Sequence, residues 1–321
     1  MPGVEPQARV GRAELETGIE RVRRLAVDAQ AGIFGPDTRL WQVNKEAAVF
    51  LGAGRAALLQ LAHPFVASAI DQHSTTREDP LGRFRRTFYQ VFSMVFASQD
   101  RAIGAARSVW ATHSRVAGRL PTGAGAWRAG TPYHANDPEA LLWVHATLWD
   151  TSVACYETLV RPLRLQEKHT YYEETKRFAY LFGIPENVLP TDWTAFRDYV
   201  EGMLASDLLF VTPAAAEIAR FLFRPPVPGL GPLMRRYQAI TSWFLPERLA
   251  VGFGLDRGGE AGRLKHEQTL RQLAALYRRL PRRLRYVPAY IEARRRLAGR
   301  EGRDWIGELL TRAFVGVPRL G

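Results

Sequence analysis

The stretches DPLGRFRRTFYQVF (residues 79–92) and SQDRAIGAARSVWATHSRVAG (residues 98–118) decide how the rest of this chain is read. Asp79 followed by Pro80 starts a helix, because the aspartate caps the first turn and proline lacks an N–H that would otherwise be unbonded there. Ser98 opens a second helix, and Gly118 is placed to close it. The pattern therefore predicts two consecutive helices joined by a short break.

These two helices carry the chemistry that stands out most. Arg83, Arg86 and Thr87 follow at i, i+3 and i+4, so they share one face of the first helix. His113 lies on the second helix, where its stripe is small and flat: Ala106, Trp110 and Ala117. Two helices of this kind, one offering Arg and Thr and the other a single His, are suited to hold a cofactor between them.

Helical periodicity continues along the whole chain and predicts an all-α fold. One helix is expected over residues 40–63, with Gly52 and Gly54 inside it at sites of close backbone packing, and a strong helix follows Asp137 and carries His145. A Gly-rich run over 120–137 is expected to be a functional or mobile loop. Further helices are predicted over 166–182, 192–207, 213–223, 231–244, 263–280, 285–297 and 302–314.

Composition narrows the class of protein. The chain has 321 residues and is 46% hydrophobic, which suffices for one large domain. Its single cysteine, Cys155, excludes an intramolecular disulfide and is expected to be a small buried residue. The N-terminus has no apolar signal region and no stretch reaches about 18 apolar residues, so the expected location is the cytoplasm, without a transmembrane segment.

Positive charge is concentrated near the C-terminus. Residues 271–300 hold ten Arg and one Glu, a net charge of +9 out of +12 for the chain. Such a segment suits peripheral contact with an anionic surface. Its arginines are also interleaved with Leu and Tyr at helical spacing, as on the solvated face of an ordinary amphipathic helix, and no specific nucleic-acid partner is expected.

Seven histidines are available for a metal site, but none forms a local ligand motif such as HExxH. A non-haem iron centre would have to assemble His73, His113 and His145 from distant segments. A haem needs only one axial protein ligand, and arginines pair with its propionates. Serine hydrolase chemistry has no support, because the chain has no GxSxG motif.

Several motifs, in order, resemble the rubber-oxygenase/MpaB-type oxygenase catalytic family, which includes the latex-clearing enzymes. They span about residues 40–250 and read GAGRAALLQLAHPFVASAIDQHS, DPLGRFRRTF, THSRVAG, YHANDPEALLWVHATLWDT, YYEE and GIPENVLP. The resemblance implies a catalytic core over 40–250, an N-terminal helical extension over 1–39, and basic C-terminal helices over 251–321 packed on the same domain. It also implies a globin-like, haem b-binding core.

The resemblance assigns roles as well. His113 matches the axial iron ligand, with His145 as an alternative ligand or a residue behind it. The RxxKT motif of the family matches RFRRT here, where Arg86 replaces the lysine and has no lone pair with which to cap the iron. Arg83 and Thr87 would be catalytic, and Arg83, Arg86, Thr87, Trp110 and His145 would contact the cofactor.

The function implied is that of a haem b-dependent oxygenase or oxidase that uses O2 on a hydrophobic small molecule, either isoprenoid or aromatic. The glutamate base of rubber cleavage has no counterpart, because a count back from Arg83 reaches Ala67, with Asp71 and His73 as loose substitutes. Two alternatives remain open: a non-haem iron enzyme and a non-catalytic haem-binding protein.

Overall fold

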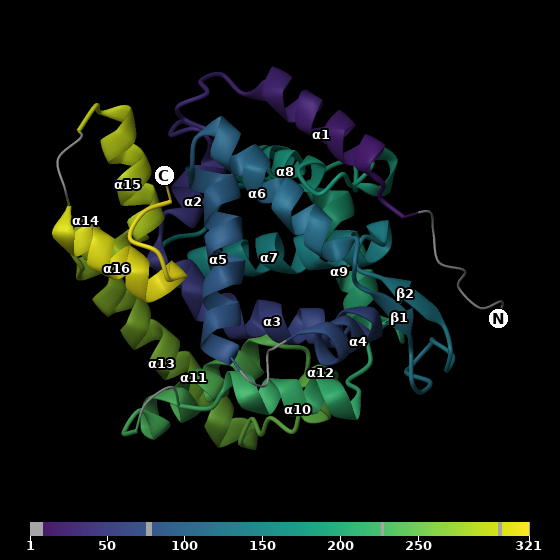
Figure 1. Cartoon of the computed structure of the whole chain (residues 1–321). Coiled ribbons are helices and arrows are strands. Elements are labelled where there is room, and N and C mark those ends of the chain that lie inside the picture. The colour runs from purple at the N-terminus through teal and green to yellow at the C-terminus, as the bar shows by residue number, and fades with distance from the viewer. Residues whose placement is uncertain (1–8, 75–78, 226–227, 301–303, 321) are drawn as a thin grey trace.

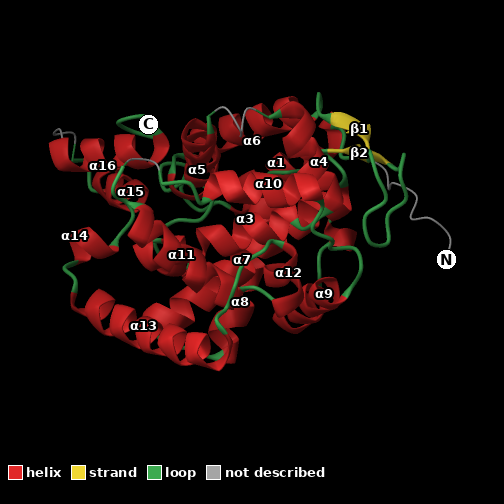
Figure 2. Ribbon diagram, turned by 90° about the horizontal axis from the view of Figure 1, so that it is seen from below, coloured by secondary structure: helices red, strands yellow, loops and turns green. Residues whose placement is uncertain are grey.

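The computed structural model describes residues 9–74, 79–225, 228–300 and 304–320, and this part of the chain is helical apart from one small hairpin (Figures 1 and 2). The first half contains α1 (Arg12–Leu25), α2 (Arg39–Asn44), the 3-10 helix η1 (Ala47–Gly52), α3 (Ala53–Leu61), α4 (Pro64–His73), α5 (Pro80–Phe96), α6 (Gln99–His113), β1 (Ala117–Arg119), β2 (Pro132–His134) and α7 (Pro138–Leu159). The second half contains α8 (Leu165–Tyr180), the 3-10 helix η2 (Glu186–Val188), α9 (Trp193–Ala205), α10 (Pro213–Leu222), α11 (Gly231–Phe244), α12 (Glu247–Gly252), α13 (Gly259–Arg279), α14 (Arg282–Arg285), α15 (Pro288–Leu297) and α16 (Trp305–Val315). The all-α prediction is confirmed.

Helix α7 lies at the centre of the molecule and contacts α2, η1, α3, α8, α9 and α13. Its N-terminus forms as the sequence predicts, because the Asp137 carboxylate accepts hydrogen bonds from the N–H groups of Glu139 and Ala140, both at 3.0 Å. Most of its side chains are buried, on more than one face. A helix that is apolar nearly all round can only be stable when other helices surround it.

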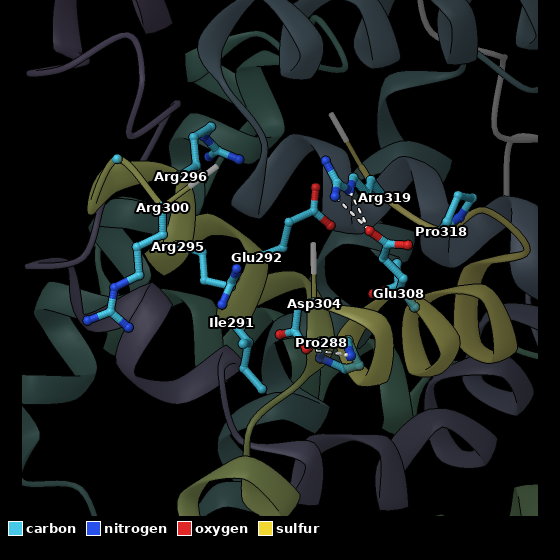
Figure 3. Close-up of a pocket in the computed structure, with 13 residues that line it drawn as sticks. Pro288, Ile291, Glu292, Arg295, Arg296, Arg300, Asp304, Glu308, Pro318 and Arg319 are labelled. Atoms are coloured by element: carbon cyan, nitrogen blue, oxygen red, sulfur yellow. Dashed lines mark hydrogen bonds and ion pairs between the residues drawn. The ribbon is translucent and has the colours of Figure 1, made fainter. Parts of the chain in front are cut away.

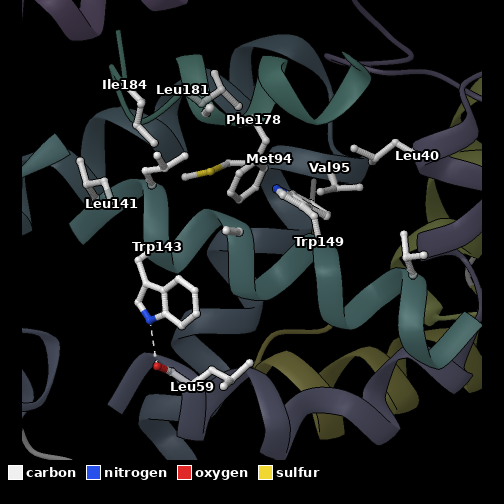
Figure 4. Close-up of a cluster of buried hydrophobic side chains, with 14 of the residues drawn as sticks. Leu40, Leu59, Met94, Val95, Leu141, Trp143, Trp149, Phe178, Leu181 and Ile184 are labelled. Atoms are coloured by element: carbon white, nitrogen blue, oxygen red, sulfur yellow. Dashed lines mark hydrogen bonds between the residues drawn. The ribbon is translucent and has the colours of Figure 1, made fainter. Parts of the chain in front are cut away.

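The main core fills the space around α7 (Figure 4). Met94 of α5, Phe178 of α8 and Trp149 of α7 come together on one side of it, and the rings of Trp149 and Phe178 meet edge to face at 5.0 Å. On another side, the indole N–H of Trp143 donates to the carbonyl of Leu59 at 2.9 Å. The core therefore ties α3, α5 and α8 to the same central helix.

A buried ion pair also joins the helices around α7. Arg55 of α3 donates from Nη2 to Oδ2 of Asp150 at 2.7 Å and from Nε to the carbonyl of Phe244 at 2.9 Å. Both charged side chains are nearly inaccessible, at 9% and 5% exposed. The second carboxylate oxygen of Asp150 accepts from Arg197 of α9. Three helices thus share one buried carboxylate.

The single helix predicted over residues 40–63 is wrong, since the chain forms α2, η1 and α3 there. The break falls at Glu46, whose backbone is extended and whose buried carboxylate accepts from Arg285 at 3.0 Å and from the hydroxyl of Tyr277 at 2.8 Å. An isolated antiparallel β-bridge between the backbones of Glu46 and Tyr286 also holds this segment in place. A partner more than 230 residues away therefore overrides the local helical pattern.

Close packing at the two glycines is confirmed. A Cβ on Gly52 would lie 2.2 Å from Cγ2 of Thr151 and 2.6 Å from Sγ of Cys155, and one on Gly54 would lie 2.6 Å from Oγ1 of Thr241. Cys155 is buried and free, as expected. Larger side chains at either glycine would push α3 and η1 away from α7 and α11.

The second helix of the opening pair ends earlier than predicted. Helix α6 stops at His113, and Gly118 belongs to strand β1, where it pairs with Tyr133 of β2. Ala117 therefore does not extend the helical stripe of His113. A Cβ on Gly118 would lie 2.6 Å from the Tyr133 hydroxyl, so the glycine allows the two strands to close.

The Gly-rich run over 120–137 forms the rest of this hairpin. Leu120, Trp127 and Tyr133 pack on Phe65 of α4 in a small core of their own, and the indole N–H of Trp127 donates to the carbonyl of Leu208 at 3.1 Å. The pattern showed no strand because each strand has only three residues, too few for an alternating signal.

In the described residues, no single helix is long and apolar enough to cross a bilayer; the pair 47–61 and 64–73 meets the length and composition only jointly, across a bend of 96°.

Candidate functional site

Helix α5 carries the three polar residues that the sequence places on one face. Asp79 caps the helix as predicted, accepting from the N–H of Gly82 at 2.8 Å. Arg83 is half-buried and donates to the hydroxyl of Ser74, the residue after α4. Arg86 and Thr87 are exposed, and Arg86 pairs with Asp79 at 3.2 Å. Only Arg83 of this face is therefore held in the protein interior.

His113, the last residue of α6, lies in the same surroundings as Arg83. Helices α5 and α6 pack side by side, and the positive charge of Arg83 acts on the His113 ring. Nδ1 of His113 is buried and has no hydrogen-bond partner in the described part of the chain. Burial lowers the pKa of His113 to about 4; a hydrogen bond to Asn136 opposes this, while the charges of His134 and Arg83 add to it. The ring is therefore neutral at physiological pH, the state in which imidazole binds a metal.

The β1–β2 hairpin brings the remaining polar groups to the end of α6. The backbone N–H of Ala135 donates to the carbonyl of Val116 at 3.0 Å, which returns the chain to the residues just after His113. Asn136 is buried, and its N–H donates to Nδ1 of His134 at 2.9 Å. The side chain of Asn136 thereby reaches the His113 ring. We refer to Arg83, His113 and Asn136 as the His113 centre.

The end of α4 lies next to this centre. The hydroxyl of Tyr133 donates to Oε1 of Gln72 at 2.8 Å, and its ring lies 6.4 Å from that of His73. Burial raises the pKa of Tyr133, and the carboxylate of Asp71 raises it further. Asp71 and His73, the loose substitutes for a catalytic base, are thus close to the hairpin, and His73 is exposed.

His145 lies elsewhere, on α7, where its side chain is buried in the core. Its Nδ1 accepts a hydrogen bond from the indole N–H of Trp149 at 3.0 Å, and Phe178 packs on the ring. Burial lowers the pKa of His145 to about 3, so the ring is neutral. Because an indole N–H can only donate, the ring proton must be on Nε2. In this arrangement His145 presents an N–H, not a lone pair, which disfavours it as an iron ligand.

The indole nitrogen of Trp110 does not contact the His113 centre. Its indole N–H donates to the carbonyl of Val10 at 3.2 Å, which holds the half-buried ring toward the segment that precedes α1. The predicted contact between Trp110 and a cofactor remains a prediction.

The three-histidine alternative has no assembled ligand set. Within the described ranges, no group of three or more His, Cys, Asp or Glu side chains is arranged to hold a metal ion. His73 is exposed at the end of α4, whereas His145 is enclosed by Trp149 and Phe178. The arrangement gives no support to a shared iron site for His73, His113 and His145.

The donor set of the His113 centre fits a haem. A neutral imidazole with a buried, unbonded nitrogen is what an axial ligand requires, and Arg83 and Arg86 are cations of the kind that pair with propionates. Two cavities, of about 360 Å³ and about 300 Å³, are lined by other parts of the protein.

Sequence reasoning missed Asn136. It belongs to the YHAND segment, where a small polar residue just before the Asp137 cap looks like part of a turn. Its burial and its position beside His113 depend on the hairpin, which the pattern did not reveal.

Acidification is expected to destabilise the fold through its buried histidines. Burial lowers the pKa of His63 and of His113 to about 4 and that of His145 to about 3, whereas the unfolded chain titrates near 6.5. The unfolded state then binds more protons below about pH 6.5, so the free energy of unfolding falls as pH falls toward 4. The measurement is urea unfolding at pH 7 and pH 5.

His63→Asn isolates one of these groups. His63 caps α4 by accepting from the N–H of Phe65 at 3.3 Å, and asparagine also serves as a helix cap. The free energy of unfolding should decrease by about 2 kcal/mol less between pH 7 and pH 5 in this variant than in the wild type. His73→Gln, at an exposed site, is the matched control and should leave the loss unchanged. Identical pH dependence in wild type and His63→Asn would contradict the argument.

The sequence is similar to a known family of oxygenases over most of its length. The family model described as "ER-bound oxygenase mpaB/B'/Rubber oxygenase, catalytic domain" matches residues 40–279. Two relatives, "Uncharacterized protein Rv2237" of Mycobacterium tuberculosis and "Uncharacterized protein Mb2261" of Mycobacterium bovis, are each 36% identical over 67 residues, or 21% of this chain. The chain spans about a quarter (26%) of the length of these relatives. No solved structure gives a significant match.

Proposed function

The chain belongs to the family of the ER-bound oxygenase mpaB/B′ and the rubber oxygenases, and on this premise we propose that it is a haem b-dependent oxygenase that uses O2 to oxidise a lipophilic small molecule. The observation that carries the proposal is the neutral His113, with a buried nitrogen that lacks a partner in the described chain, beside the guanidinium of Arg83. An isoprenoid or aromatic substrate is the class to test first.

In this proposal His113 supplies the axial nitrogen to the iron. Asn136, buried beside the ring, would fix its orientation, as partners of metal-binding histidines generally do. Such partners typically change metal affinity by about 10–100-fold, so Asn136 is a positioning residue. The haem, when bound, would supply the activation of O2.

Helix α5 provides the remaining groups. Arg83 and Arg86 are cations that would pair with the propionates and draw electron density from the reacting oxygen. Thr87, one turn after Arg83, can donate a hydrogen bond to the oxygen atoms of the substrates. Because Thr87 is exposed, the lipophilic substrate would approach from this side.

Thr87→Ala is expected to slow turnover without loss of haem. Removal of one hydrogen-bond donor from a reacting oxygen typically lowers kcat by about 10²-fold. Since Thr87 is exposed, the variant should fold normally. Steady-state oxygen uptake and the haem absorption of each variant are the two measurements.

Thr87→Ser keeps the hydroxyl and is the control. This variant should have most of the wild-type activity. Loss of haem from Thr87→Ala, with serine unable to restore it, would show a structural role and contradict the catalytic one.

The proposed reaction itself is tested with haemin-loaded protein, oxygen uptake and ¹⁸O2. Isoprenoid and aromatic compounds that stimulate uptake should yield products with ¹⁸O incorporated, detected by mass spectrometry. Haem bound without uptake on any compound would favour a non-catalytic haem-binding protein. Stoichiometric iron without porphyrin would favour the non-haem alternative, which no cluster of described residues supports.

A further inference from the structure

The C-terminal helices gather at one end of the molecule. In both Figure 1 and Figure 2, α15 and α16 lie at the end opposite the β1–β2 hairpin, and Figure 2 places α14 with them. These helices follow residue 279, where the match to the oxygenase family ends. The family match therefore assigns no function to this end of the protein.

Helix α16 presents an apolar face to solvent. Trp305 and Leu309, one turn apart, are each 69% exposed, and Arg312 follows on the same side and is also exposed. The helix is properly formed, because Asp304 caps it by accepting from the N–H of Gly307 at 3.1 Å. An exposed Trp and Leu on one side, bordered by arginine, is the pattern of a helix that lies in a membrane interface.

The opposite side of α16 faces α15 across the cavity of about 360 Å³ (Figure 3). The cavity carboxylates already have partners within the protein: Glu308 pairs with Arg319 at 2.6 Å, and Glu292 accepts from the N–H of Leu320 at 2.9 Å. Asp304 serves as the helix cap. These acidic groups are therefore not directed toward an external partner.

The arginines of α15 give this end its charge. Arg296 donates to the carbonyls of Phe96 at 2.7 Å and Gln30 at 3.0 Å, which neutralise none of its charge. Arg294 is exposed, and Arg295 and Arg300 line the cavity. The positive field at this end is therefore only partly compensated.

Helix α14 repeats the combination of exposed arginine and leucine. Arg282 and Arg283 are exposed, and Leu284 between this pair and Arg285 is 62% exposed. On α13, Leu276 is 60% exposed two residues before Arg278. Exposed apolar side chains and exposed cations thus occur together on α13, α14 and α16.

We propose that this end docks on an anionic lipid bilayer. Trp305 and Leu309 enter the interface between headgroups and acyl chains, and the exposed arginines Arg282, Arg283 and Arg294 contact anionic headgroups. Charge complementarity selects this partner: in a symmetric dimer through this end, the exposed arginines Arg282, Arg283 and Arg294 of the two copies would repel one another. A nucleic acid would use the arginines but would leave the apolar face of α16 uncovered.

Vesicle co-sedimentation of the full chain tests the proposal. Phosphatidylcholine vesicles with 30% phosphatidylglycerol are compared with phosphatidylcholine alone, at about 0.1 M and about 0.5 M salt, a range that shortens the screening length severalfold. The wild type should bind the anionic vesicles, and high salt should weaken that binding at least tenfold. Equal binding to both vesicles, or binding to neither, would overturn the proposal.

Variants separate the apolar contribution to vesicle binding from the ionic contribution. Trp305→Ser with Leu309→Ser should lower the partition coefficient at least tenfold, and Arg282→Gln with Arg283→Gln and Arg294→Gln should lower it similarly and reduce the salt dependence. Leu165→Ser, at a site 61% exposed on α8, is the matched control and should bind like wild type. Circular dichroism confirms that each variant is folded.

Two outcomes of this series would contradict a membrane surface. If Trp305→Ser with Leu309→Ser binds vesicles like wild type, the face of α16 is not the docking element. If that variant instead converts a dimer into a monomer, and the wild type does not bind vesicles, the face is an interface between copies of the chain. Size-exclusion chromatography with light scattering reads out the second case.

Discussion

Replacing His113 with alanine is expected to abolish stoichiometric haem binding. Burial keeps this ring neutral at physiological pH, with a pKa of about 4, and leaves Nδ1 without a partner in the described chain. A haem in this site would have no other imidazole from the His113 centre to hold its iron. Titration with haemin should show the Soret band of the wild type and at least a 100-fold weaker affinity for the variant.

Two histidine variants control this result. His73→Ala removes an exposed ring near the centre, and His145→Gln keeps an acceptor for the Trp149 indole. Both should bind haem like wild type. Imidazole added to His113→Ala should restore part of the absorption by filling the space left by the ring. An unchanged Soret band in His113→Ala, or its loss in His145→Gln, would contradict the assignment of the axial ligand.

Asp150→Ala is expected to be the most destabilising of the substitutions proposed. The variant leaves the buried guanidinium of Arg55 without its counter-ion, a change that typically costs about 3–5 kcal/mol. Arg197 loses a partner at the same time. Thermal unfolding followed by circular dichroism should show a decrease in Tm of about 6–20 °C, at about 2–4 °C per kcal/mol.

Glu201→Ala is the matched control for the ion pair. Glu201 pairs with the same Arg197 at 2.9 Å, but its side chain is 66% exposed. An exposed pair of this kind contributes at most about 1 kcal/mol, so Tm should change by no more than about 4 °C. Equal shifts for Asp150→Ala and Glu201→Ala would mean that burial of the Arg55 pair contributes nothing.

Features fixed by neighbouring residues were predictable from the sequence. Asp79 and Pro80 start α5, Thr212 and Pro213 start α10, and the predicted range 231–244 coincides with α11. In each case the signal is a cap or a periodicity contained within one or two helical turns. The same locality explains why Arg83 and Thr87 could be placed on one face of α5.

Features fixed by distant partners were not predictable. The break at Glu46 depends on Arg285, and the Arg55–Asp150 pair joins residues 95 positions apart. The net charge of residues 271–300 counts Arg285 as one of ten similar arginines, although its guanidinium binds the buried carboxylate of Glu46. The two strands of the hairpin are too short to give an alternating pattern, so neither the hairpin nor the approach of Asn136 to His113 could be predicted from the sequence.

The case of His145 lies between these extremes. Its spacing of four residues from Trp149 already places both on one face of α7. The hydrogen bond from the indole, which fixes the proton on Nε2, follows only from the three-dimensional geometry. On the ground of this hydrogen bond we propose His113 rather than His145 as the ligand, a preference that the motif around His145 could not provide.

The central claim, a haem b held by His113, is tested most directly by the absorption spectrum of the purified wild-type chain before and after addition of haemin. A pyridine haemochrome assay and iron quantification on the same sample give the stoichiometry. The account predicts a Soret band and about one haem b per chain. A colourless protein that also fails to bind added haemin would contradict it.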